Sequence, residues 1–165
     1  MRAFDPTSEV ERPKHAYHDN LYHYNIGIAN GNGQYEVHIK ADNPELINVK
    51  TLETIIKENG DEGKRITYLK SDIEGTEIAC LNQWLKSGIM DLVDQLGIEM
   101  HTGTLNVNKG YVKMIFKRMK SFVKSLLAHH NLALTSYNPN MLLEKTQDSQ
   151  RKYYTHHDLL FVRRK

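Results

Sequence analysis

Acidic residues follow three of the segments that we expect to form strands, and one of these segments also ends in a histidine. In open α/β sheets, ligands bind at the carboxyl ends of the strands, so polar residues at these ends form a candidate site. Carboxylates and an imidazole in one cleft can take or give a proton, or orient a substrate. In chain order, the residues concerned are Asp5, Asp72, Glu74, Glu99 and His101.

Four of these residues come in two pairs with the same spacing. Asp72 and Glu74 are two residues apart, and so are Glu99 and His101. Side chains two apart on an extended backbone point the same way. Because the two strands that carry them are expected to be neighbours, we expect all four side chains to converge on one cleft.

Each of these positions also has a plain structural interpretation. Asp5 precedes a proline, which is typical of an acid in a turn. Asp72 and Glu74 precede an expected helix that begins near Glu77, and acids at that place stabilise the helix dipole. This interpretation suits Glu77 best, whereas Asp72 lies at the tip of the strand and is expected in the cleft.

Some of these acidic residues and the histidine could instead bind a divalent metal ion. Glu99 and His101, alongside Asp72, are residue types that hold a hard or borderline ion. A solvated strand end is the commoner arrangement, so we expect no metal here. The paired histidines lack helical ligand spacing and are interpreted as ordinary polar ends of elements; they are His129, His130, His156 and His157.

The elements that must position these side chains alternate between strands and helices. This alternation predicts an α/β sandwich with a mainly parallel sheet. The last two strands have no helix between them, which favours an antiparallel pair at the C-terminal end. We expect one domain over residues 1–165. The expected strands are 2–4, 22–28, 35–40 (broken by 42–44), 66–71, 96–100, 132–137 and 158–162, and the expected helices follow Thr51 as N-cap, follow Gly75, and span 112–127.

Composition and charge limit the class of protein. The chain has 165 residues, 39% of them hydrophobic and 25% charged, and its net charge is +2. A nucleic-acid binder usually has a strong basic excess, so we expect no nucleic-acid partner. A single cysteine, Cys80, excludes an intrachain disulfide. The sequence has no apolar run long enough to span a membrane and no segment typical of a signal peptide, which leaves the compartment open.

The expected helix at residues 112–127 is both amphipathic and basic. Such a helix can lie on a membrane surface or bind an acidic partner. In an α/β chain the simpler interpretation is a helix packed on the sheet with its charges in water, and we expect that arrangement.

Two short motifs carry a family resemblance. Thr-Leu-Glu at residues 51–53 begins a helix, and Lys-Ser-Asp-Ile-Glu-Gly-Thr-Glu at residues 70–77 ends a strand. Together they resemble the FkbM-type family of S-adenosylmethionine-dependent methyltransferases, which includes animal methyltransferase-like proteins and has a block ending in Lys-x-Asp-x-Glu-Gly-x-Glu. Glu-Met-His at 99–101 and Phe-Asp-Pro at 4–6 are also similar to that family, so the resemblance covers nearly the whole chain.

The resemblance implies a Rossmann-like class I methyltransferase sheet and transfer of a methyl group from S-adenosylmethionine, most simply to an oxygen nucleophile. It implies that Asp5 hydrogen-bonds the ribose hydroxyls of the cofactor and that Asp72 also contacts the cofactor. The catalytic residues that it implies are Asp72, Glu74, Glu99 and His101. It does not identify the methyl acceptor.

One element of the family is not found in this sequence. Members begin with a strand and a glycine-rich turn that holds the methionine part of the cofactor. Here Gly31-x-Gly33 follows another strand and opens no helix. We therefore expect an N-terminally incomplete sheet, a fragment or truncated form, and weak cofactor binding by this chain alone. The alternative is a non-catalytic interaction module that retains the fold.

Overall fold

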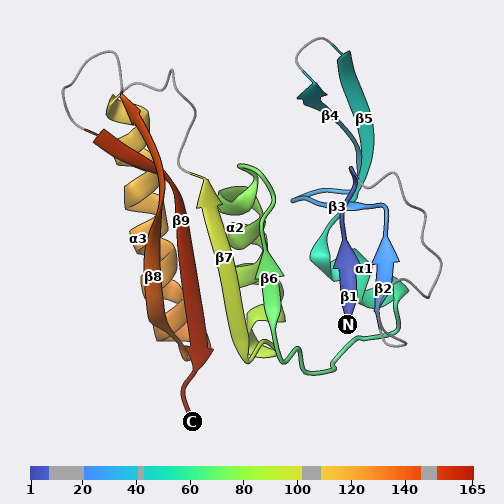
Figure 1. The fold of residues 1–165 in the computed structure, drawn as a ribbon. Coiled ribbons are helices and arrows are strands. Elements are labelled where there is room, and N and C mark those ends of the chain that lie inside the picture. The colour runs from blue at the N-terminus through green and yellow to red at the C-terminus, as the bar shows by residue number, and fades with distance from the viewer. Residues whose placement is uncertain (8–20, 41–42, 102–108, 146–151) are drawn as a thin grey trace. The chain divides into compact units, whose positions relative to one another are not determined.

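The computed structural model describes residues 1–7, 21–40, 43–101, 109–145 and 152–165 (Figure 1). The chain divides into two compact units, Met1–Asp61 and Glu62–Lys165, and each is described by itself. Both units combine strands with helices, which confirms the expected α/β character of the chain. The single domain expected from the sequence stays a prediction.

The described residues of the first unit form two small sheets and one helix. In the first sheet, two strands pair in parallel. In the second, the central strand pairs in parallel on one side and antiparallel on the other. The elements are β1 (Arg2–Phe4), β2 (Tyr22–Tyr24), β3 (Gly27–Ile28), β4 (Gly33–Lys40), β5 (Asn43–Lys50) and α1 (Leu52–Glu58).

Strand β5 is the main difference from the sequence prediction in this unit. The sequence predicted a break at residues 42–44, but a strand begins at Asn43. Proline is tolerated near a strand start and at irregular pairing. Pro44 is the second residue of β5, and the register of β4 and β5 shifts nearby, between Val37 and Lys40. On its other side, β5 pairs with β3 only at Val49 and Lys50, so no partner strand there needs an N–H from Pro44.

Helix α1 begins as the sequence predicted. The Thr51 hydroxyl accepts a hydrogen bond from the Thr54 backbone N–H at 3.1 Å, which is the N-cap arrangement. The Thr51 backbone N–H in turn donates to Asn32 Oδ1 at 2.9 Å. The turn at residues 29–33 is therefore tied to the helix start.

The described part of the second unit forms a four-stranded sheet in the order β6-β7-β9-β8, with the two longer helices on one face (Figure 1). Strands β6 and β7 are parallel, whereas β9 is antiparallel to both of its neighbours. The expected antiparallel pair at the C-terminal end is confirmed. Because β9 lies between β7 and β8, this sheet is mixed rather than mainly parallel. The elements are β6 (Leu69–Ser71), α2 (Glu77–Ser87), the 3-10 helix η1 (Ile89–Asp91), β7 (Gln95–His101), α3 (Lys109–His130), β8 (Leu132–Lys145) and β9 (Lys152–Arg163).

The core of the second unit lies between its sheet and its helices. Trp84 of α2, Leu126 of α3 and Phe161 of β9 are fully buried. The rings of Phe122 and Phe161 meet edge to face with centroids 5.9 Å apart, a favourable arrangement. The basic helix therefore packs on the sheet, as expected. Among the described residues, no helix is long and apolar enough to cross a membrane.

Arg163, at the end of β9, makes several hydrogen bonds to backbone carbonyls at one end of this core. The Arg163 guanidinium donates to the backbone carbonyls of Met90, Val93 and His130 at 2.5 to 3.0 Å. These carbonyls belong to η1, to the segment before β7 and to the end of α3. The Arg163 side chain thus links β9 to the η1–β7 segment and to the C-terminal end of α3.

Adjacent leucines on α3 offer a matched test of this packing. Leu126 is fully buried and Leu127 is 41% exposed. We expect Leu126→Ala to lower the free energy of unfolding by about 2–5 kcal/mol through lost burial and a cavity. We expect Leu127→Ala to lower it by less than about 1 kcal/mol. Urea denaturation followed by circular dichroism measures both, and equal losses would contradict the packing described.

Candidate active site

The parallel pair β6 and β7 brings its carboxyl ends to one edge of the sheet. Ser71, the last residue of β6, lies opposite Ile98 of β7. Asp72 and Glu74 therefore follow β6 at the edge where Glu99 and His101 end β7. This is the edge at which parallel sheets place ligands.

The strongest contact of the cluster joins His101 to Glu77. His101 Nδ1 lies 2.6 Å from Glu77 Oε1. The same oxygen accepts a hydrogen bond from the Gly75 backbone N–H at 3.0 Å. Glu77 is only 1% exposed, and the His101 side chain is 12% exposed. A buried carboxylate bonded to an imidazole holds the ring in one orientation and stabilises its charged form.

A tight turn between β6 and α2 puts Glu77 in this place. Glu74 has φ 51° and Gly75 has φ 101°, both in the left-handed range. Glycine adopts such a φ at little cost, whereas residues with a side chain rarely do. Helix α2 begins at Glu77 directly after this turn, so the Glu77 carboxylate reaches both the Gly75 N–H of the turn and His101 of β7.

The other nitrogen of His101 faces two more acids. His101 Nε2 lies 3.4 Å from Glu74 Oε2 and 3.9 Å from Asp72 Oδ1. The Asp72 side chain is 42% exposed and the Glu74 side chain is 84% exposed. Both distances exceed the usual range of a good hydrogen bond, about 2.7–3.2 Å. Nε2 therefore faces an open, acidic side of the cluster, whereas Nδ1 faces a buried one.

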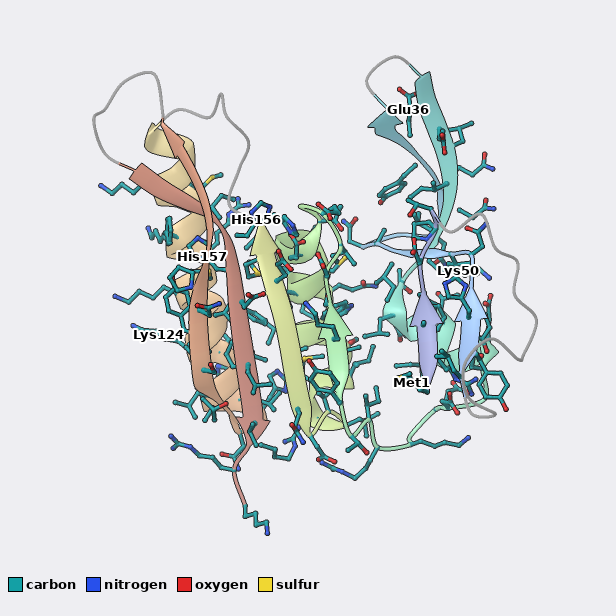
Figure 2. All side chains as sticks on the ribbon, viewed as in Figure 1. Met1, Glu36, Lys50, Lys124, His156 and His157 are labelled. Atoms are coloured by element: carbon teal, nitrogen blue, oxygen red, sulfur yellow. The ribbon has the colours of Figure 1, made fainter. Side chains whose placement is uncertain are left out.

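A second histidine reaches the cluster from β9. His101 and His156 are direct partners in the antiparallel pairing of β7 and β9. Their rings meet edge to face with centroids 4.6 Å apart. Figure 2 shows His156 at the end of the sheet where β7 ends. Glu99, His101 and His156 each offer a ligand atom, and these atoms lie within 4.8 Å of one another.

The cluster contains the four residues of the second unit that the sequence predicted. It also contains Glu77 and His156, for which the sequence predicted other roles. Glu77 was interpreted chiefly as an acid that stabilises the helix dipole, but it is buried and bonded to His101. The interpretation of His156 and His157 as ordinary polar ends is wrong. His156 joins the cluster, and His157 is 1% exposed with a hydrogen bond to the Tyr137 hydroxyl at 2.9 Å.

The pair at residues 129–130 is different, because α3 does end there. His130 Nδ1 contacts Asp91 at 2.7 Å. For these two histidines, the expected place at the end of an element is confirmed.

Burial and charge shift three pKa values in the cluster. Burial raises the pKa of Glu77, but the hydrogen bonds from His101 and from the Gly75 N–H outweigh it, so the net shift is downward. Burial lowers the pKa of His101, but Glu77, Glu74 and Asp72 outweigh it and raise the pKa overall. Burial and the nearby Asp72 and Asp158 carboxylates raise the pKa of Glu99.

Asp5 belongs to the first unit, where it follows β1. Its Oδ1 accepts hydrogen bonds from the Thr7 backbone N–H at 2.9 Å and from the Thr7 hydroxyl at 2.8 Å. This is the turn arrangement that the simpler interpretation of Asp5 predicted. A contact between Asp5 and a ribose stays a prediction.

Comparison with known proteins gives a structural likeness to a methyltransferase. No protein-family model matches the chain, and no curated protein matches it. The crystal structure of Methyltransferase FkbM from Methylobacillus flagellatus KT is similar to it with 16% sequence identity and a TM-score of 0.41. The match covers 84% of this chain and 28% of that one, so the chain spans less than a third of that methyltransferase.

The pair of Glu77 and His101 predicts how the cluster titrates in metal-free buffer. We expect the His101 pKa to lie above the ordinary value of about 6.5. Glu77→Gln removes the partner charge, so the His101 pKa should fall. Glu53→Gln, which changes an acid in the first turn of α1, should leave it unchanged. Proton NMR of the imidazole signals measures all three forms.

The same shifts set a pH window for stability. The raised His101 pKa gives stability that is lost as pH rises through that pKa, and the lowered Glu77 pKa gives stability that is lost as pH falls through it. The pair should therefore stabilise most between the two. A Glu77→Gln variant whose unfolding free energy differs from that of the original chain equally at all pH values would contradict this assignment.

Proposed function

We propose that this chain is part of a S-adenosylmethionine-dependent methyltransferase of the FkbM type, which transfers a methyl group to an oxygen acceptor. The observation that carries the proposal is the buried Glu77–His101 pair at the carboxyl ends of β6 and β7. Glu77 is the last residue of the Lys-x-Asp-x-Glu-Gly-x-Glu motif at residues 70–77. The motif and the geometry thus support the same site.

The chemistry of this site follows from the two sides of the imidazole. Glu77 accepts a hydrogen bond from Nδ1–H, which leaves Nε2 on the acidic, open side as a proton acceptor. A hydroxyl group of an acceptor molecule that reaches Nε2 can give up its proton there. The buried Glu77 carboxylate then stabilises the imidazolium that forms. Asp72 and Glu74 lie where they can hold further hydroxyls of that molecule.

Among the described residues, neither Asp5 nor the glycines after β3 have the arrangement expected of a cofactor site. Oδ1 of Asp5 already accepts two hydrogen bonds from Thr7. Gly33, from the glycine pair that follows β3, begins strand β4 and not a helix. We therefore assign the acceptor side of the reaction to this chain and propose that the chain by itself binds S-adenosylmethionine weakly.

A second candidate function is a non-catalytic interaction module with the same fold. Strand β8 favours it, because it forms an edge of the four-stranded sheet and carries the exposed side chains of Leu134 and Tyr137. Open strand edges can pair with a strand of a partner protein. In that case the acidic cluster would have no role in methyl transfer.

Cofactor binding separates the two functions. We expect S-adenosylmethionine to perturb backbone NMR signals around Asp72 with a dissociation constant in the millimolar range. Asp72→Asn should weaken this binding further. A dissociation constant in the micromolar range would contradict the incomplete cofactor site. Unchanged spectra at saturating cofactor would instead favour the interaction module.

Methyl transfer tests the role of His101 directly. The chain is incubated with saturating isotope-labelled S-adenosylmethionine and a panel of small polyhydroxylated acceptors. Where transfer is detected, we expect His101→Gln to reduce its rate by about 10²–10⁴-fold, the usual contribution of a general base. His129→Gln, a change of an exposed histidine at the end of α3, is the matched control. Equal rates in the two variants would remove His101 from the mechanism.

A further inference from the structure

Two groups of potential metal ligands meet at one histidine. The first consists of Glu99, His101 and His156, and the second of Asp72, Glu74 and His101. In each group the donor atoms lie within 4.8 Å of one another. Asp72 and Glu74 follow β6, Glu99 and His101 lie at the end of β7, and His156 lies within β9, so three neighbouring strands contribute to one place.

We propose that His101, His156 and Glu99 bind a borderline divalent transition-metal ion such as Zn²⁺, with Asp72 or Glu74 as a further ligand. Two imidazoles and a carboxylate are a donor set that such ions prefer, and a carboxylate or water completes four-coordination. Hard ions such as Mg²⁺ favour oxygen ligands and retain their water.

The distances fit this class of ion. Ligand atoms about 2.0–2.1 Å from a tetrahedral Zn²⁺ lie about 3.3–3.4 Å from one another. His101 Nε2 and Glu74 Oε2 are 3.4 Å apart, and His101 Nε2 and Asp72 Oδ1 are 3.9 Å apart. The exposed Glu74 side chain can adjust by rotation, because 84% of it is accessible.

The buried Glu77 supplies an independent observation. A histidine that binds a metal through one nitrogen almost always donates its other N–H to a carboxylate, a carbonyl or a water. Glu77 Oε1 lies 2.6 Å from His101 Nδ1 and takes this second role. Nε2 is then the nitrogen available to an ion, and it is the one that faces Asp72 and Glu74.

The charges around the cluster also favour a cation. Glu99 and Asp158 are direct partners in the pairing of β7 and β9, and like charges in that position repel. Asp72 adds to the same negative field, which Lys70 and His101 partly oppose. A divalent ion bound by Glu99 would relieve the repulsion.

This inference concerns the site of the proposed function but needs neither cofactor nor methyl acceptor. A bound ion would occupy the Nε2 position, so His101 would be a ligand rather than a base while the ion is present. An acceptor hydroxyl in contact with the ion would then lose its proton to solvent water more readily, because the ion lowers the pKa of a bound hydroxyl. Metal binding and methyl transfer are measured separately, so failure of one is distinguishable from failure of the other.

Calorimetric titration of the metal-free chain with Zn²⁺ in the presence of a competing chelator tests the proposal. We expect one ion per chain with a dissociation constant below 1 µM (an order-of-magnitude expectation) and binding of Mg²⁺ at least about 100-fold weaker, as an imidazole-containing site requires. His156→Gln and Glu99→Gln should each weaken Zn²⁺ binding by at least about 10-fold, and Glu77→Gln by about 10–100-fold through the orientation of His101.

His129→Gln is the matched control and should bind Zn²⁺ as the original chain does. Circular dichroism shows whether each variant is folded. If His156→Gln does not fold, the Zn²⁺ affinity of Glu99→Gln tests the proposal in its place. Visible absorption of the Co²⁺-substituted chain should show the bands of a four-coordinate site. Binding of Zn²⁺ no tighter than Mg²⁺, or an equal loss in His129→Gln and in the folded variants at residues 99 and 156, would overturn the proposal.

Discussion

The buried hydrogen bond between Glu77 and His101 is the interaction on which the candidate site depends. A carboxylate that is 1% exposed is costly unless charged or polar partners replace its water. His101 Nδ1 and the Gly75 N–H are such partners. Because this contact fixes the orientation of the His101 ring, Nε2 points toward Asp72 and Glu74. Proton transfer and metal binding both require such a fixed direction.

Three features of the backbone bring this interaction about. The parallel pairing of β6 and β7 places two strand ends at one edge. The left-handed turn at Glu74 and Gly75 then lets α2 begin with its first carboxylate beneath that edge. Finally, the insertion of β9 between β7 and β8 brings His156 beside His101. A polar cluster of this kind therefore draws on residues far apart in the sequence.

The sequence predicted the parts of this arrangement that depend on local signals. The Thr51 cap and the acids after β6 have short-range signatures in the sequence, and the structure has both. The roles of Glu77 and His156 depend on pairing across strands. Glu77 faces a residue 24 positions away, and His156 meets His101 through an antiparallel register. The sequence predicted a strand only over 158–162, so His156 lay outside the expected element, whereas β9 begins at Lys152.

The tautomer of His101 tests the central claim most directly. Nitrogen-15 chemical shifts of the imidazole, measured above its pKa in metal-free buffer, report which nitrogen carries the proton. If Glu77 accepts from Nδ1–H, the neutral ring should carry its proton on Nδ1 and leave Nε2 bare. A neutral ring with its proton on Nε2 would contradict the account, because neither the base nor the metal ligand would then face the acidic side of the cluster.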